Sequence, residues 1–107
     1  EKARELQLYG VLAAAQMQGL DVDQILNSVA SCHLIVDLTH LTFVDSTGLI
    51  LLLKIKKTVA SSGHTCLTCG ASTNVTQMLR VTRLNHFFPS LQDIQKARDA
   101  LDDIICS

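Results

Sequence analysis

The sequence lacks the features that mark several large classes of protein. No apolar stretch approaches the roughly 20 residues that a helix needs to cross a bilayer, and no basic-then-apolar signal segment opens the chain. The formal net charge is only −1, so the basic stripe typical of nucleic-acid-binding domains is not expected. These absences argue against membrane insertion and against direct nucleic-acid binding, and they predict a cytoplasmic protein.

The length and the apolar content fit one globular domain. The chain has 107 residues, of which 48% are hydrophobic, and this is enough for a single core. We therefore expect residues 1–107 to form one domain. The sequence begins with Glu1 rather than methionine, so we allow for residues upstream of it.

The four cysteines are better interpreted as reduced thiols than as cross-links. Nothing in the sequence indicates export, and a core of this size does not need disulfides. Cys66 and Cys69 have the C-x-x-C spacing of a zinc or redox site. On a strand, however, residues three apart point to opposite faces, so the two sulfurs could not share a metal without a turn. Buried apolar residues are the favoured interpretation, and neither a metal nor another cofactor is expected.

Strand and helix patterns alternate along the chain, which predicts an α/β fold with a small, mostly parallel sheet of about four strands and helices packed against it. Strand patterns occur at 6–11, within 33–44 (with a turn at Thr39–His40), at 64–69 and at 87–89. Helical patterns occur at 22–30 (capped by Asp21), at 47–60, from 71–73 onward with Val75, Met78, Leu79 and Val81 as its apolar stripe, and after a cap at Ser90 that Asp93 strengthens.

The stretch around residues 42–49 is the most informative part of the sequence. A run rich in Leu, Ile, Val and Phe ends at Val44, the small polar segment Asp45-Ser46-Thr47-Gly48 follows, and an apolar helical segment continues to about Ala60. Either Asp45 or Ser46 can accept a hydrogen bond from the first free N–H groups of that helix. Ser46 therefore lies where the helix dipole favours negative charge, and a phosphate attached to it would suit the backbone there.

The same residues carry a family resemblance. Leu-Thr-Phe-Val-Asp-Ser-Thr-Gly-Leu at 41–49, preceded by His-Leu-Ile-Val-Asp-Leu at 33–38, resembles the signature of the STAS domain family, and within it the anti-sigma-factor antagonists of bacteria. The resemblance spans roughly residues 6–101. It implies a non-enzymatic binding module of the bacterial cytoplasm whose partner is an anti-sigma factor serine/threonine kinase. In that family the first serine after the aspartate is phosphorylated by this kinase, and here that residue is Ser46.

The neighbours of Ser46 are candidate partner-binding residues. Asp45 can cap the helix, and its charge can also present Ser46 to a kinase and repel a phosphate there. Thr47 is the second choice for modification. Gly48 either lets the backbone of a partner come close or is small because the packing requires it.

The helix at 47–60 offers a further candidate contact surface. At about 100° per residue, Ile50 lies between Lys54 and Lys57 on the solvent side and close to the direction of Ser46. An apolar side chain flanked by lysines beside a capping serine fits a docking face, although a single exposed isoleucine needs no explanation.

Three alternatives remain open at the sequence level. A Ser-His-Asp triad on Ser46 is disfavoured because the Gly-x-Ser-x-Gly elbow is missing. The family also includes constitutive subunits of lipid- or anion-transport assemblies, and this is the alternative function.

In the family the first strand usually follows another strand at the sheet edge. Without that strand, the exposed edge would invite pairing with another chain, including a second copy in a homodimer.

Overall fold

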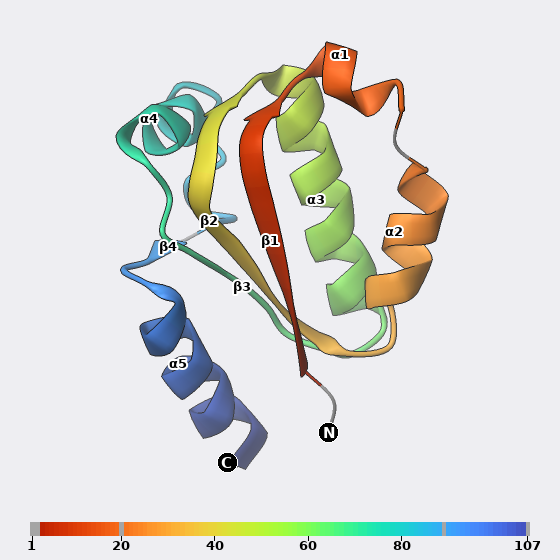
Figure 1. Cartoon of the computed structure of the whole chain (residues 1–107). Helices are drawn as coiled ribbons and strands as arrows, with labels where there is room; N and C mark the ends of the chain where they lie inside the picture. The colour runs from red at the N-terminus through yellow and green to blue at the C-terminus, as the bar shows by residue number, and fades with distance from the viewer. Residues whose placement is uncertain (1–2, 20, 89, 107) are drawn as a thin grey trace.

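The computed structural model describes residues 3–19, 21–88 and 90–106 (Figure 1). Its elements, in chain order, are β1 (Ala3–Leu12), α1 (Ala14–Met17), α2 (Val22–Val29), β2 (His33–Val44), α3 (Ser46–Ser61), β3 (Cys66–Cys69), α4 (Thr73–Val81), β4 (Ser90–Leu91) and α5 (Ile94–Cys106). The described residues include no helix that is long and apolar enough to span a bilayer.

The strands form one sheet in the order β1-β2-β3-β4, and each neighbouring pair is parallel. Leu34 of β2 is in register with Cys66 of β3, and Thr68 of β3 with Ser90 of β4. The predicted α/β fold with a small, mostly parallel sheet is therefore confirmed. Parallel neighbours need crossover connections, and α2, α3 and α4 lie in those connections.

Successive residues of β2 point to opposite faces of the sheet, and each face is covered by different helices. Leu34 and Val36 belong to the main core, which they share with residues of α2, α3 and α4. Ile35 points the other way, into a smaller cluster with Ala97 and Leu101 of α5. Figure 1 shows α5 on its own, well apart from the α2–α3 pair. A strand covered on both faces is apolar at successive positions, and this explains the Leu-Ile-Val run.

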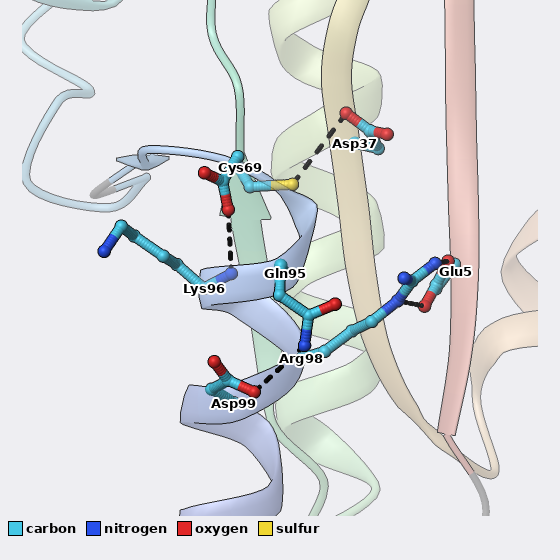
Figure 2. A network of polar contacts seen from close by, with 8 residues as sticks. Glu5, Asp37, Cys69, Gln95, Lys96, Arg98 and Asp99 are labelled. Carbon is cyan, nitrogen blue, oxygen red and sulfur yellow. Dashed lines mark hydrogen bonds and ion pairs between the residues drawn. The ribbon is translucent and has the colours of Figure 1, made fainter.

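On this second face, polar side-chain contacts join α5 to β1 and join β3 to β2 (Figure 2). The guanidinium of Arg98 donates to both carboxylate oxygens of Glu5 on β1, at 2.6 and 2.8 Å. The thiol of Cys69 donates to Asp37 Oδ1 on β2 at 3.8 Å. Because Cys69 faces α5 whereas Cys66 packs against the main core, the two thiols lie on opposite faces of the sheet, as the strand period predicted.

The predicted turn at Thr39–His40 is wrong, because β2 continues through these residues. Pairing with β1 instead shifts register between Gln7 and Tyr9, where β2 contributes one residue more than β1. The carboxylate of Asp37 accepts hydrogen bonds from both the backbone N–H and the hydroxyl of Thr39 at 3.0 and 2.5 Å. This local contact explains why the strand bulges here and does not turn.

The helix predicted at 22–30 is confirmed with its cap, since Asp21 accepts from the N–H of Gln24 at 3.1 Å. Other predictions fail near the end of the chain. Phe87, predicted in an extended segment at 87–89, lies in a turn, and the strand is instead Ser90–Leu91. Pro89, the last residue of that predicted segment, lies outside the described residues.

Ser90 does not cap the last helix, because Asp93 accepts from the N–H of Lys96 at 2.9 Å and occupies that position. Val81 was expected in the buried stripe of α4 but is 74% exposed, while Val75 and Leu79 are buried as expected. Val81 is the last residue of α4, where the helix has passed the edge of the core.

Candidate functional site

The start of α3 is organised by Asp45, which is the N-cap of this helix. Its Oδ1 accepts from the N–H of Gly48 at 2.9 Å, and its Oδ2 accepts from the N–H of Ala14 at 3.1 Å. These N–H donors, that of Gly48 foremost, lower the pKa of the Asp45 carboxyl below its ordinary value. Of the two residues that could have capped the helix, Asp45 does so, and it carries a negative charge at neutral pH.

Main-chain contacts of Asp45 complete the connection between three elements. Its N–H donates to the carbonyl oxygen of Leu12, the last residue of β1, at 3.2 Å, and its own carbonyl accepts from Leu49 at 3.0 Å. The end of β1, the start of α1 and the start of α3 are thus joined through one residue. This arrangement fixes the backbone on which Ser46 stands.

Ser46 is the first residue of α3 and is exposed. Its hydroxyl makes no hydrogen bond to any residue that the structure describes. Thr47, the next residue and the second choice for modification, is half-buried and so less accessible than Ser46. The Ser46 hydroxyl is therefore free in solvent at the N-terminal end of a sixteen-residue helix, where unpaired N–H groups and the dipole favour negative charge.

Gly48 is buried, and the structure supports the packing explanation for it. A Cβ atom built on Gly48 would lie 2.3 Å from the carbonyl oxygen of Leu12 and 2.6 Å from Cγ2 of Val44. The position has no room for a side chain because β1 and β2 end directly against the first turn of α3. A direct contact between Gly48 and a partner stays a prediction.

The exposed side of α3 follows the helical wheel. Ile50 is 54% exposed, and Lys54 and Lys57 are exposed on the same side of the helix. The opposite side of the helix faces the core and is buried: Leu49, Leu51, Leu52, Ile55 and Val59. Ser46, Ile50, Lys54 and Lys57 therefore form one continuous solvent-facing strip, which we call the Ser46 strip. Its contact with a partner stays a prediction.

The histidines do not assemble with Ser46. His40 stacks on Tyr9 with ring centroids 4.9 Å apart, and His33 meets His64 edge to face at 5.0 Å. No described histidine is hydrogen-bonded to Ser46, and no three His, Cys, Asp or Glu side chains lie together as a metal site in the described part of the chain. None of the described histidines is therefore placed as a base beside the Ser46 hydroxyl.

Sequence reasoning missed two features near this end of the molecule. The N–H of Ala14 is a second donor to Asp45, and no local pattern could indicate it because the two residues are 31 positions apart. Val11 and Phe43, paired in register on β1 and β2, are 43% and 45% exposed although both side chains are apolar. Nothing in the sequence shows that α5 leaves this part of the second face uncovered.

Comparison with known proteins places the chain in a family. Residues 8–97 match the model of the STAS domain, so the chain belongs to the STAS domain family. No curated protein sequence matches it.

The fold is shared with solved structures of low sequence identity. A candidate anti-sigma factor antagonist from Thermotoga maritima has a TM-score of 0.80 at 19% identity, with 94% of this chain and 87% of that chain covered. A sulfate transporter family protein from Wolinella succinogenes has a TM-score of 0.82 at 14% identity, with 98% and 88% covered. The unphosphorylated anti-sigma factor antagonist SpoIIAA has 0.72 at 17% identity, with 95% and 90% covered.

Proposed function

We propose that this protein is an anti-sigma factor antagonist, a non-enzymatic binding module of the bacterial cytoplasm that is controlled by phosphorylation of Ser46. In its unmodified form, the Ser46 strip binds an anti-sigma factor kinase and causes release of the sigma factor. The kinase transfers the γ-phosphoryl group of ATP to the Ser46 oxygen, ADP leaves, and the modified protein dissociates. The observation that carries the proposal is the free, exposed hydroxyl of Ser46 on the first turn of α3.

Charge accounts for the switch. A phosphate on Ser46 adds about −1.5 to −2 charges at neutral pH, directly beside the ionised carboxylate of Asp45. In the free protein, solvent and the N-terminus of α3 stabilise the added charge. In a complex, the partner would strip water from both negative groups, which costs on the order of several kcal/mol of binding free energy.

The switch requires no large rearrangement of the protein. Both carboxylate oxygens of Asp45 already accept backbone hydrogen bonds, and the backbone around it is tied to Leu12 and Ala14. The phosphate is therefore added to a backbone that is already fixed, and local repulsion at the interface is sufficient.

The docking surface extends from Ser46 along α3. At a rise of about 1.5 Å per residue, the strip from Ser46 to Lys57 is roughly 16 Å long. Ile50 supplies the apolar contact near its centre, and the two lysines supply a positive rim for carboxylates of the partner. This composition fits a protein partner better than a small ligand, because the strip is convex.

Phosphorylation by a recombinant anti-sigma factor kinase from the same organism tests the assignment. With ATP present, intact-mass spectrometry should show one added phosphate on the wild type and on Thr47→Ala, and none on Ser46→Ala. Thr47→Ala is the matched control because it removes the neighbouring hydroxyl. Equal labelling of Ser46→Ala and wild type would exclude Ser46 as the main acceptor.

A constitutive subunit of a lipid- or anion-transport assembly is the second candidate. It is favoured by the shared fold with the sulfate transporter family protein, whose TM-score of 0.82 is as high as that of the antagonist from Thermotoga maritima. Affinity purification from native lysate separates the two functions. Recovery of a kinase with its sigma factor supports the first function, and recovery of transporter components supports the second.

A further inference from the structure

A cavity of about 430 Å³ opens at the carboxyl ends of β3 and β4, away from the Ser46 strip. Ala71, which follows β3, and Leu91 and Gln92 at the end of β4 form one side of it. The other side comes from α4, with Thr76 and Arg80, and from the turn that follows α4. Its volume is within the range of small-molecule sites.

The cavity lies where the chain leaves β3 for α4 and returns to β4. After β3 the chain passes to α4, whose Val75 and Leu79 belong to the main core. After the neighbouring strand β4 it passes to α5, whose Ala97 and Leu101 cover the opposite face. The connections from two adjacent parallel strands thus leave in opposite directions, and Figure 1 shows α4 and α5 far apart on the two sides of β4. The lining comes from α4, from the turn after it and from the end of β4, so the cavity lies on the α4 side of these strand ends. In open parallel sheets, ligands bind outside the carboxyl ends of the strands.

Four polar side chains line the cavity and have no side-chain partner in the described part of the protein. Thr76, Arg80, Asn85 and Gln92 make no side-chain hydrogen bond or ion pair with any residue that the structure describes. Their hydroxyl, guanidinium and amide groups can all donate hydrogen bonds. Phe88, which is only 3% exposed, lines the same cavity and provides an apolar surface beside these donors.

The surrounding charge favours an anion. No aspartate or glutamate occurs between Asp45 and Asp93, so none of the ten acidic side chains comes from α3, β3 or α4. The ammonium group of Lys56 on α3 lies 5.3 Å from the centroid of the Phe88 ring. Arg80 is therefore the cation of the lining, and Lys56 adds positive charge at Phe88. The carboxylate of Asp93, which follows Gln92, already accepts the N–H of Lys96 at 2.9 Å.

We propose that this cavity is a binding site for a small organic anion, a phosphate monoester or a carboxylate attached to an apolar group. The planar guanidinium of Arg80 binds the anionic oxygens in a two-pronged manner. Asn85, Gln92 and the hydroxyl of Thr76 supply further donors, and the apolar part of the ligand lies against Phe88. The site is separate from Ser46 and does not depend on the function proposed for it.

Small aromatic anions test the site directly. The ¹⁵N-labelled protein is titrated with phenyl phosphate and with benzoate, and separately with inorganic phosphate and with benzyl alcohol. At least one aromatic anion should bind saturably, with shifts centred on Ala71, Thr76, Asn85 and Gln92, and more tightly than inorganic phosphate or benzyl alcohol. The anion that binds better identifies phosphate or carboxylate as the preferred group. Absence of saturable shifts for both anions, or shifts centred elsewhere, overturns the proposal.

A pair of arginine variants distinguishes a built site from a general positive field. Arg80→Gln removes the guanidinium from the cavity, whereas Arg83→Gln removes the same charge three residues further on, from an exposed position outside the lining. Loss of a charged hydrogen-bonding group should weaken binding by about tenfold or more in Arg80→Gln. Arg83→Gln should bind as the wild type does. Equal weakening in both variants would overturn the proposal, and amide spectra of each variant verify that it remains folded.

Discussion

Replacing Gly48 with alanine tests how tightly the first turn of α3 is packed. The added Cβ would lie 2.3 Å from the carbonyl oxygen of Leu12, which is backbone and cannot rotate away, and 2.6 Å from Cγ2 of Val44. Overpacking of this kind typically costs 1–3 kcal/mol, and the upper part of that range, about 3 kcal/mol, applies because a backbone atom is involved. Alanine regains about 1 kcal/mol of helix propensity over glycine.

The net expectation for Gly48→Ala is a loss of about 2 kcal/mol in the free energy of unfolding, or about 10 °C in Tm for a domain of this size. Gly19→Ala is the matched control, because a Cβ at Gly19 meets nothing within 4 Å. Urea denaturation of both variants gives the two values. A Gly48→Ala protein as stable as the wild type would show that the first turn of α3 is not packed against β1 as described.

The same substitution should loosen the site. The carbonyl of Leu12 that meets the new Cβ also accepts the N–H of Asp45. In Gly48→Ala, hydrogen exchange should therefore accelerate more at the Asp45 amide than at amides in the centre of α3, because displacement of this carbonyl weakens the Asp45 hydrogen bond directly. Uniform acceleration along α3 would instead indicate general destabilisation.

Further predictions concern Asp45, Ile50 and the cysteines. The pKa of Asp45 is lowered in the folded protein, so its carboxylate stabilises the fold above about pH 4. This contribution is lost as the pH falls through the folded-state pKa. The difference in unfolding free energy between wild type and Asp45→Asn, measured by urea denaturation, should therefore shrink from pH 7 to pH 3. Ile50→Ala should change the free energy of unfolding by no more than about 0.5 kcal/mol, because the side chain is exposed, yet weaken kinase binding about tenfold in calorimetry. Burial raises the pKa of Cys66 and Cys69 to about 11, so in a Cys106→Ser background both should react with iodoacetamide at pH 8 on the order of 100-fold more slowly than free cysteine.

The parts of the fold that depend on local pattern could be predicted from the sequence. The cap at Asp21, the end of β2 at Val44 and the buried face of α3 follow from residues close to one another in the chain. The alternation of side chains along a strand alone predicts that Cys66 and Cys69, three residues apart on β3, point to opposite faces of the sheet.

Two of the errors, at Ser90 and at Thr39, share a physical cause, which is contact between distant segments. Ser90 has the composition of a helix cap, but its hydroxyl accepts the N–H of Ala71, which follows the neighbouring strand, so Ser90 belongs to β4. The bulge at Thr39 depends on pairing with β1 as well as on its bonds to Asp37. Tertiary pairing of this kind overrides local preference, and a single sequence does not reveal it.

In the candidate site, too, the local features could be predicted from the sequence and the contacts between distant segments could not. The exposed position of Ser46 and the helix start beside it follow from the sequence. The crowding at Gly48 and the link from Asp45 to Ala14 do not, because both depend on where β1 ends relative to α3. Sequence reasoning therefore located the hydroxyl but not the contacts that hold its backbone in place.

The most direct test of the proposed switch compares binding of the kinase to the unmodified protein and to protein carrying phosphoserine only at position 46. Calorimetry with the recombinant anti-sigma factor kinase gives both dissociation constants. Desolvation of two adjacent negative groups predicts binding at least about 100-fold weaker for the phosphorylated form, with Ser46→Ala binding as the wild type does. Equal affinities for the phosphorylated and unmodified forms would contradict the account.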